Sequence, residues 1–279
     1  MLSRIVGTCG CMAALVSPAV AVAQSLLVAS PAVVINDRTR TAPLVLINDG
    51  VEAVEATVST FFGYPVTDST GRMYLRTFAG SADTAPSAAG WVESFPKRLR
   101  IAPKSRATVR LLVNPPAGLK PGEYWSRLMV SARGGHAPVA GIADSLGVVA
   151  KLDLEVRSVI ALFYRVGTPA TGVTMSGLRS WRTGDSLTAR VLLTRTGNAA
   201  FVGAVRARLV DAKGVTRSET LLPVGVYYDL EPLVGLPLAG VPPGHYTLRL
   251  ETVAHRPDVL PELLLPAASA RDSLPVDIK

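Results

Sequence analysis

Short apolar runs separated by turn residues are the feature that most limits how this chain can fold. No long segment places apolar residues at the i, i+3, i+4, i+7 spacing of an amphipathic helix. The turn-forming residues glycine (24) and proline (21) are frequent among the 279 residues, and charged residues make up only 18%. Short strands at this spacing predict an all-β protein built from sandwiches.

The runs with strand character cover 26–35, 43–47, 51–62, 72–78, 99–101, 107–113, 124–130 and 148–165, and then 187–194, 203–210, 216–223, 230–236 and 246–253. Between them, residues 36–40 form a polar turn, and 80–90 and 132–147 are loops of small residues.

The first 23 residues have the form of a secretory signal peptide. A positive start at Arg4 precedes a short apolar stretch and the small-residue site Ala21-Val22-Ala23. A retained N-terminal anchor is the alternative. Because Cys9 and Cys11 both lie inside this segment, the mature chain is expected to contain no cysteine. No later segment has 18 consecutive apolar residues, so we expect no integral membrane segment after signal removal and a periplasmic location.

The mature chain divides into two expected domains of sandwich size, 24–166 and 167–279, because the strand pattern restarts after Val166. A small repeat supports this division. Tyr124 and Tyr246 lie 122 residues apart, and each follows a Pro-Gly turn and begins an apolar strand. This arrangement is typical of the tyrosine corner of immunoglobulin-like sandwiches.

Four pieces of the first domain then occur in a characteristic order. They are an apolar first strand containing Pro31, the turn Asn48-Asp49, a block from Phe95 to Leu111 with the pattern P-x-R-L-x-I-x-P followed by V-R, and Leu162-Phe163-Tyr164-Arg165. In these pieces the chain resembles the periplasmic pilus-assembly chaperones of the PapD type. The resemblance covers residues 26–165 and implies two immunoglobulin-like β-sandwich domains, the first of them PapD-like.

The resemblance implies a mechanism in which the last strand of the first domain lends apolar side chains to a subunit that lacks a strand. The residues that match the donor positions are Leu152, Leu154 and Val156, which extend an alternating apolar set that begins with Val148 and Ala150. Charged residues dominate the opposite set. The alternative is an ordinary half-buried antiparallel strand, which would alternate in the same way.

The chain departs from the family in its cleft. The family holds the carboxyl end of its subunit with an arginine on the first strand and a lysine on the last. Here the matching positions are Val33, or Ala32 in the other register, and Ala161, all apolar. The resemblance therefore supports the fold better than it supports pilus-subunit binding.

A basic stretch is the other candidate binding feature. Between residues 97 and 110 the sequence has no acidic residue and six cations, namely Lys97, Arg98, Arg100, Lys104, Arg106 and Arg110. They could meet an acidic partner or form a solvated strand face. No motif for nucleic-acid binding, a metal site or nucleophilic catalysis occurs, so we expect a non-enzyme without cofactors.

Two functions remain open at this point. One is a periplasmic chaperone-like protein for subunits of a pilus or envelope structure, with an outer-membrane usher as a further partner. The other is a structural or adhesive module of the cell envelope without chaperone activity. An exposed edge strand can also pair with a second copy, which leaves a homodimer open.

Overall fold

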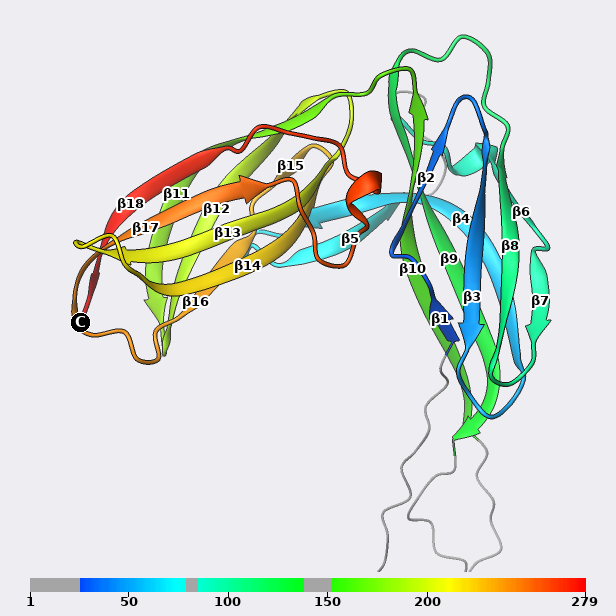
Figure 1. Ribbon diagram of the computed structural model, residues 1–279, viewed down its shortest axis with the longest axis horizontal. Helices are drawn as coiled ribbons and strands as arrows, with labels where there is room; N and C mark the ends of the chain where they lie inside the picture. The colour runs from blue at the N-terminus through cyan, green and yellow to red at the C-terminus, as the bar shows by residue number, and fades with distance from the viewer. Residues whose placement is uncertain (1–25, 79–84, 138–151) are drawn as a thin grey trace, which may run out of the picture.

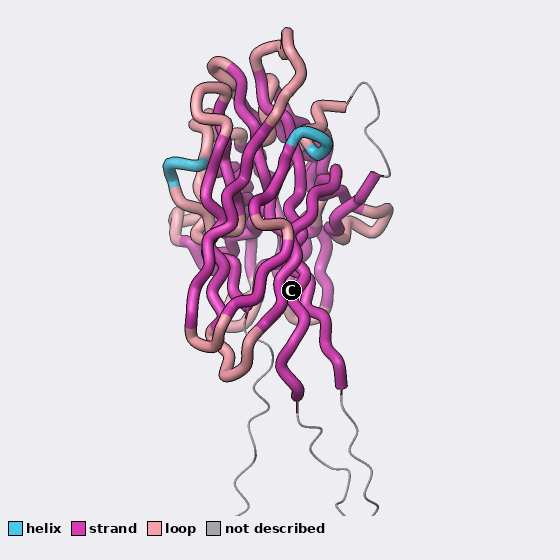
Figure 2. The backbone as a smooth tube through the Cα atoms, turned by 90° about the vertical axis from the view of Figure 1, so that its right-hand side faces the viewer, coloured by secondary structure: helices cyan, strands magenta, loops and turns pink. Residues whose placement is uncertain are grey.

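The computed structural model describes residues 26–78, 85–137 and 152–279, and side chains in those ranges except at 135–137 and 152–154. The expected signal peptide lies outside the described residues. Strands account for nearly all regular structure in the described ranges, and Figure 2 shows how little helix accompanies them. The predicted all-β class is therefore confirmed.

Among the described residues before 167, ten strands and one short 3-10 helix form the N-terminal half. They are β1 (Leu26–Val28), β2 (Ala32–Asn36), β3 (Thr41–Asn48), β4 (Val54–Thr67), β5 (Met73–Phe78), η1 (Ala89–Trp91), β6 (Val92–Phe95), β7 (Arg98–Ile101), β8 (Ser105–Val113), β9 (Gly122–Ala137) and β10 (Leu152–Val166).

Eight strands and a second 3-10 helix form the C-terminal half. They are β11 (Thr171–Thr183), β12 (Ser186–Gly197), β13 (Phe201–Asp211), β14 (Thr216–Val226), β15 (Asp229–Leu230), β16 (Leu233–Pro237), β17 (Gly244–Val253), η3 (Pro261–Leu263) and β18 (Arg271–Ile278). The expected domain boundary falls in the connection between β10 and β11.

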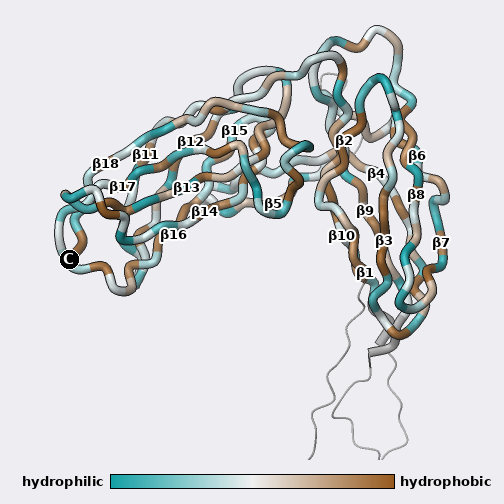
Figure 3. The backbone as a smooth tube through the Cα atoms, viewed as in Figure 1, coloured by the Kyte–Doolittle hydropathy of each residue, from teal (hydrophilic) through white to brown (hydrophobic). Residues whose placement is uncertain are grey.

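Each half is a sandwich of two sheets (Figure 1). In the N-terminal half one sheet has the order β1-β3-β8-β6, and the other has the order β2-β10-β9-β4-β5 with β7 also on β4. In the C-terminal half β11-β12-β15, with β16 also on β12, faces β14-β13-β17-β18. Apolar and polar residues alternate along most strands (Figure 3), and the apolar ones, such as Leu111, Leu162 and Leu250, fill the two cores.

Tyrosine corners occur in both halves, as the repeat predicts. The Tyr124 hydroxyl donates to the Lys120 carbonyl at 3.0 Å, and the Tyr246 hydroxyl donates to the Pro242 carbonyl at 2.7 Å. Each bond fixes the turn that begins a central strand, β9 or β17.

Two sequence expectations were wrong in detail. Residues 26–35 form two strands, because Pro31 lacks an N–H and the Ser30 hydroxyl bonds the Ala32 carbonyl at 2.6 Å. The polar strands β11 and β18, and the short β6, carry too weak an apolar pattern to be predicted.

Candidate strand-binding edge and cleft

Strand β10 has two differently covered segments. Along its whole length it pairs antiparallel with β9. On its other side it pairs parallel with β2, but only from Ala161 to Arg165. Within the described residues, Leu152–Ile160 therefore has no strand neighbour on that side, and a row of backbone N–H and C=O groups is left for a further strand.

The break between β1 and β2 creates this open edge. Before Pro31, the chain pairs with β3 in the opposite sheet, and after it the chain pairs with β10. Figure 1 shows β2 beside the upper part of β10. Strand β2 thus covers one end of that side of β10 and leaves the other end uncovered.

The side of β10 that faces the core becomes exposed toward the open segment. Leu162 is fully buried, Ile160 is 6% exposed and Val156 is 38% exposed. Val156 lies opposite the buried Ala132 of β9, and cross-strand partners share a face. An apolar side chain on the core side of the sheet is thus accessible beside unpaired backbone.

The other expected donor residues are only partly placed. Leu152 and Leu154 lie in β10, four and two residues before Val156, but their side chains are outside the described part. Val148 and Ala150 lie outside the described residues. The donor role of these five residues stays a prediction.

The outer face of the open segment carries an ionic cluster. The Glu155 carboxylate accepts hydrogen bonds from Arg157 Nε at 3.0 Å and from Arg133 Nη2 at 3.0 Å. These bonds, from Arg157 first and Arg133 second, lower the pKa of Glu155 to about 2. The cluster has one acid and two cations, so it has a net positive charge at neutral pH.

The two halves meet at a junction that combines a buried ion pair with aromatic packing. Glu123 Oε2 accepts a bond from Arg165 Nε at 2.9 Å, and its other oxygen accepts bonds from the Trp125 indole and the Ala200 amide. Burial raises the pKa of Glu123, and Arg165 opposes that rise. Tyr227 packs edge-on against Trp125 with ring centroids 4.8 Å apart. The Glu123–Ala200 and Trp125–Tyr227 contacts join the two halves.

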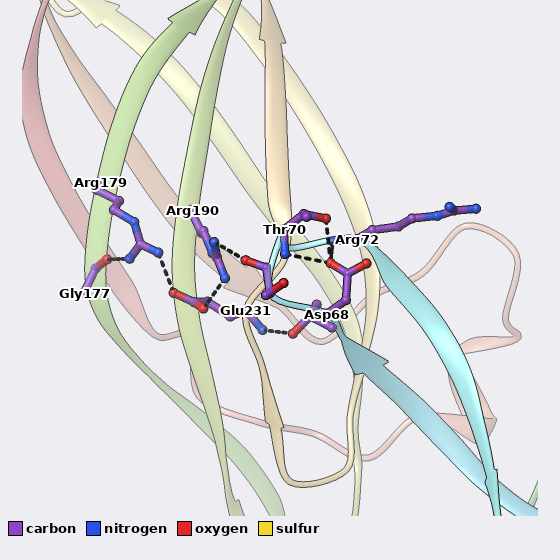
Figure 4. A network of polar contacts seen from close by, with 9 residues as sticks. Asp68, Thr70, Arg72, Gly177, Arg179, Arg190 and Glu231 are labelled. Carbon is purple, nitrogen blue, oxygen red and sulfur yellow. Dashed lines mark hydrogen bonds and ion pairs between the residues drawn. The ribbon is translucent and has the colours of Figure 1, made fainter.

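The β4–β5 hairpin makes a second contact between the two halves (Figure 4). Its tip rests on the C-terminal half, where Arg190 donates to the Ser69 carbonyl at 3.0 Å and to Glu231 at 2.7 Å. Gly71 has a φ of +87°, and a Cβ there would approach Leu233 to 2.8 Å, so the tip requires glycine.

A small cavity lies in the cleft where the open edge ends. It measures about 70 Å³, and its lining includes Pro31, Ala32, Ala161, Arg127 and Arg256. Ala32 and Ala161, two of the apolar residues considered as cleft positions, are direct partners in the β2–β10 ladder, and Val33 is the partner of Leu162.

Arg127 brings a cation to this cavity from a third strand. It lies on β9 directly opposite Ala161 and is 7% exposed. Its Nε donates to the Gly63 carbonyl at 2.9 Å, whereas its Nη2 is buried and has no hydrogen-bond partner among the described residues. The nearby carboxylates Glu123 and Asp258 are paired with Arg165 and Arg256.

The surroundings of Arg127 do not neutralise its charge. The guanidinium carbon lies 5.1 Å from the centre of the Tyr227 ring. Burial raises the pKa of Tyr227 to about 12, so its phenol is uncharged at physiological pH. A buried cation without an anionic partner is costly, and an incoming carboxylate would relieve that cost.

The basic stretch does not form one patch. Arg98 and Arg100 on β7 alternate with Leu99 and Ile101, which pack on the N-terminal core, so they face outward from the six-stranded sheet. Arg106 and Arg110 likewise face outward from the β1-β3-β8-β6 sheet, on the opposite side of the sandwich. Lys97 is exposed before β7, and Lys104, in the connecting turn, pairs with Asp49 at 2.9 Å.

Neither a metal cluster nor a membrane helix is found in the described ranges. No group of three or more His, Cys, Asp or Glu side chains there could hold a metal ion. None of the helices described there has the length and apolar character needed to cross a membrane.

Comparison with solved structures finds similar chains that are covered over almost their whole length. The CupB2 chaperone of Pseudomonas aeruginosa is 12% identical, with 91% of this chain and 100% of that chain covered and a TM-score of 0.46. The YadV chaperone is 14% identical, with 90% of this chain and 99% of that chain covered and a TM-score of 0.44. A chain from the Salmonella enterica SafA pilin in complex with the SafB chaperone is 13% identical, with 90% of this chain and 97% of that chain covered and a TM-score of 0.42. No protein-family model and no curated protein matches the sequence.

Proposed function

We propose that this protein is a periplasmic chaperone-like protein that binds an incomplete β-sandwich subunit of a pilus or surface structure. A strand of the subunit would pair with the open edge of β10 at Leu152–Ile160. Val156, together with Leu152 and Leu154, would fill the groove that the missing strand leaves in the subunit. Backbone hydrogen bonds would supply affinity, and alternate side chains would supply specificity.

The observation that carries this proposal is the coincidence of unpaired backbone with an exposed apolar side chain. Open sheet edges recruit further strands, and soluble proteins usually protect them. On β10 the unprotected segment is also the one where the core-side residue Val156 is 38% exposed. A strand added there would complete the ladder and cover that side chain together.

The cleft supports a direction for the added strand. A strand added along β10 can extend only as far as Ala161, because β2 pairs with β10 from that residue onward. A strand parallel to β10 would bring its carboxyl end to the cavity that holds Arg127 Nη2, whereas an antiparallel strand would bring an ammonium group there. The unpaired guanidinium favours the carboxylate, with a charge-assisted bond worth about 1.5–3 kcal/mol.

The proposal is tested by co-purification of envelope subunits with the protein expressed in its own cell. We expect a subunit to co-purify with the wild-type protein and Val156→Arg to reduce its recovery at least tenfold. Val51→Arg is the matched control, since Val51 is 71% exposed in the connection between β3 and β4 and is not part of β10. Equal recovery with Val156→Arg would show that strand addition at this edge is wrong.

A second test addresses the cleft. Arg127→Met keeps an unbranched side chain and removes the guanidinium charge. We expect it to weaken binding of a peptide with a free carboxyl terminus about tenfold, and to leave binding of the corresponding carboxamide nearly unchanged. If both peptides lose affinity equally, Arg127 does not hold the carboxylate.

A further inference from the structure

The outer face of the six-stranded sheet is organised in rows that run across the strands to the open edge. In the first row the register places Arg100, Glu55, Arg133 and Glu155 opposite one another in turn, from β7 through β4 and β9 to β10. The charges alternate in sign from strand to strand, which is the favourable arrangement for cross-strand pairs. This row is balanced before any partner arrives.

The second row ends differently. It runs from Arg98 through Thr57 and Ser131 to Arg157 at the open edge. The neighbours of Arg157 across the sheet are therefore neutral. Its carboxylate partner is Glu155 of the first row, which Arg157 shares with Arg133. The side chain of Arg157 is 60% exposed. Its Nε and its Nη2 each donate one hydrogen bond to Glu155.

The third row is apolar at the edge. Ser59 is opposite Met129, and Met129 is opposite Val159, which is 42% exposed. Val159 lies two residues closer to the cleft than Arg157 on the same face of β10. The outer face of the open segment thus offers a partner a cationic position and then an apolar one.

We propose that the partner strand carries an acidic side chain beside Arg157 and an apolar side chain beside Val159, the apolar one being nearer its carboxyl end. This inference rests on the proposed strand addition. It specifies the side chains on the outward face of the partner strand. Val156, in contrast, lies on the core side of β10 and would fill the groove of the subunit. Arg157 then acts as a specificity residue that selects among strands with equally apolar inward faces.

The expected discrimination is modest, because the pair is exposed. Exposed ion pairs contribute little to affinity, and a like-charge contact costs a similarly small amount. Replacing a matched acid by a base on the partner should therefore change affinity about three- to tenfold, and the ratio should shrink as salt is raised.

Three synthetic peptides test the inference by calorimetry. Each has alternating valines at the inward positions, a free carboxyl terminus and leucine at the last outward position. They differ at the preceding outward position, which is glutamate, serine or lysine. We expect affinity for the wild-type protein to fall in that order, with protection of the Leu152–Ile160 amides from hydrogen exchange.

Two charge-reversal variants complete the test. Arg157→Glu should reverse the order of the peptides, while Arg98→Glu, on the same face at the far edge of the sheet, should leave it unchanged. If all three peptides bind with equal affinity and protect the same amides, the inference is overturned and strand addition stands. If none binds and no amide is protected, the proposed function fails and the inference fails with it.

Discussion

The two halves share a sandwich and a tyrosine corner but treat their sheet edges differently. In the C-terminal half, edge strand β18 contains Pro275, edge strand β14 contains Pro223, and β11 has an irregular register between Ser176 and Arg179. Proline and bulges are common devices against unwanted strand pairing. Segment Leu152–Ile160 of β10 has no proline, and its extra residue at the bulge lies on β9.

This difference teaches that the open edge is not a general property of the fold. The C-terminal half blunts the edges formed by β11, β14 and β18, whereas the N-terminal half leaves the long segment Leu152–Ile160 without a proline. That segment adjoins the cavity containing Arg127 and has an exposed apolar residue on its core side. We interpret this open edge as a binding site for a partner strand. Substitutions that block the edge or alter its surroundings test this interpretation.

The largest expected effect is at the junction that joins the halves. Arg165→Ala leaves Glu123 buried without its cation, which should lower the free energy of unfolding by about 3 kcal/mol in urea denaturation at neutral pH. Arg157→Ala, at the exposed cluster, should cost less than about 1 kcal/mol. If both variants lose the same stability, the junction does not couple the halves as described.

The same variant has a pH signature. Burial already raises the pKa of Glu123, and removal of Arg165 should raise it further. A carboxyl group whose folded pKa lies above its unfolded value favours folding in its protonated form. The stability of Arg165→Ala should therefore be closest to wild type at pH values below about 4.3, and the deficit should grow as pH rises through the folded pKa.

A pair of prolines in β10 tests the edge itself. The Ala161 amide donates to the Pro31 carbonyl on the β2 side, so the amides of Arg157 and Val159 face the open side, and that of Ser158 faces β9. Ser158→Pro should remove a ladder bond and cost about 2 kcal/mol or more, measured by urea denaturation.

Val159→Pro should cost much less stability and yet reduce binding of the glutamate peptide at least tenfold, because a partner strand loses one donor. Calorimetry and thermal unfolding on the same samples separate the two effects. Normal peptide binding by a folded Val159→Pro protein would contradict strand pairing along this edge.

The tyrosine corners provide a smaller comparison between the halves. Tyr124→Phe and Tyr246→Phe each remove one hydrogen bond to a turn carbonyl, and we expect each to lower the free energy of unfolding by about 1 kcal/mol. The loss should be larger at Tyr246, which is 8% exposed, than at the less buried Tyr124. The reverse order would show that burial does not set the strength of these bonds.

Local patterns in the sequence predicted the all-β class, the tyrosine corners and the polar turn after residue 35, because each depends on neighbouring residues. The resemblance implied a donor strand at Leu152, Leu154 and Val156, but local patterns could not show where its edge is open, because that depends on which sheet each side of Pro31 joins. The six cations at 97–110 likewise separated because β7 and β8 belong to different sheets. Arg127 left a signal that was missed, as the one charged residue within the apolar run 124–130.

The smallest expected effect concerns the ionic cluster at the open edge. The pKa of Glu155 is lowered to about 2, with the hydrogen bond from Arg157 as the largest cause. Its ion pairs should therefore be complete above its ordinary value of about 4.3 and should be lost only as pH falls toward 2. In a carboxyl NMR titration, Arg157→Ala should move the Glu155 midpoint upward more than Arg133→Ala does. An unchanged midpoint in Arg157→Ala would mean that Arg157 does not pair with Glu155. The three side chains would then not form the ionic cluster described at the open edge.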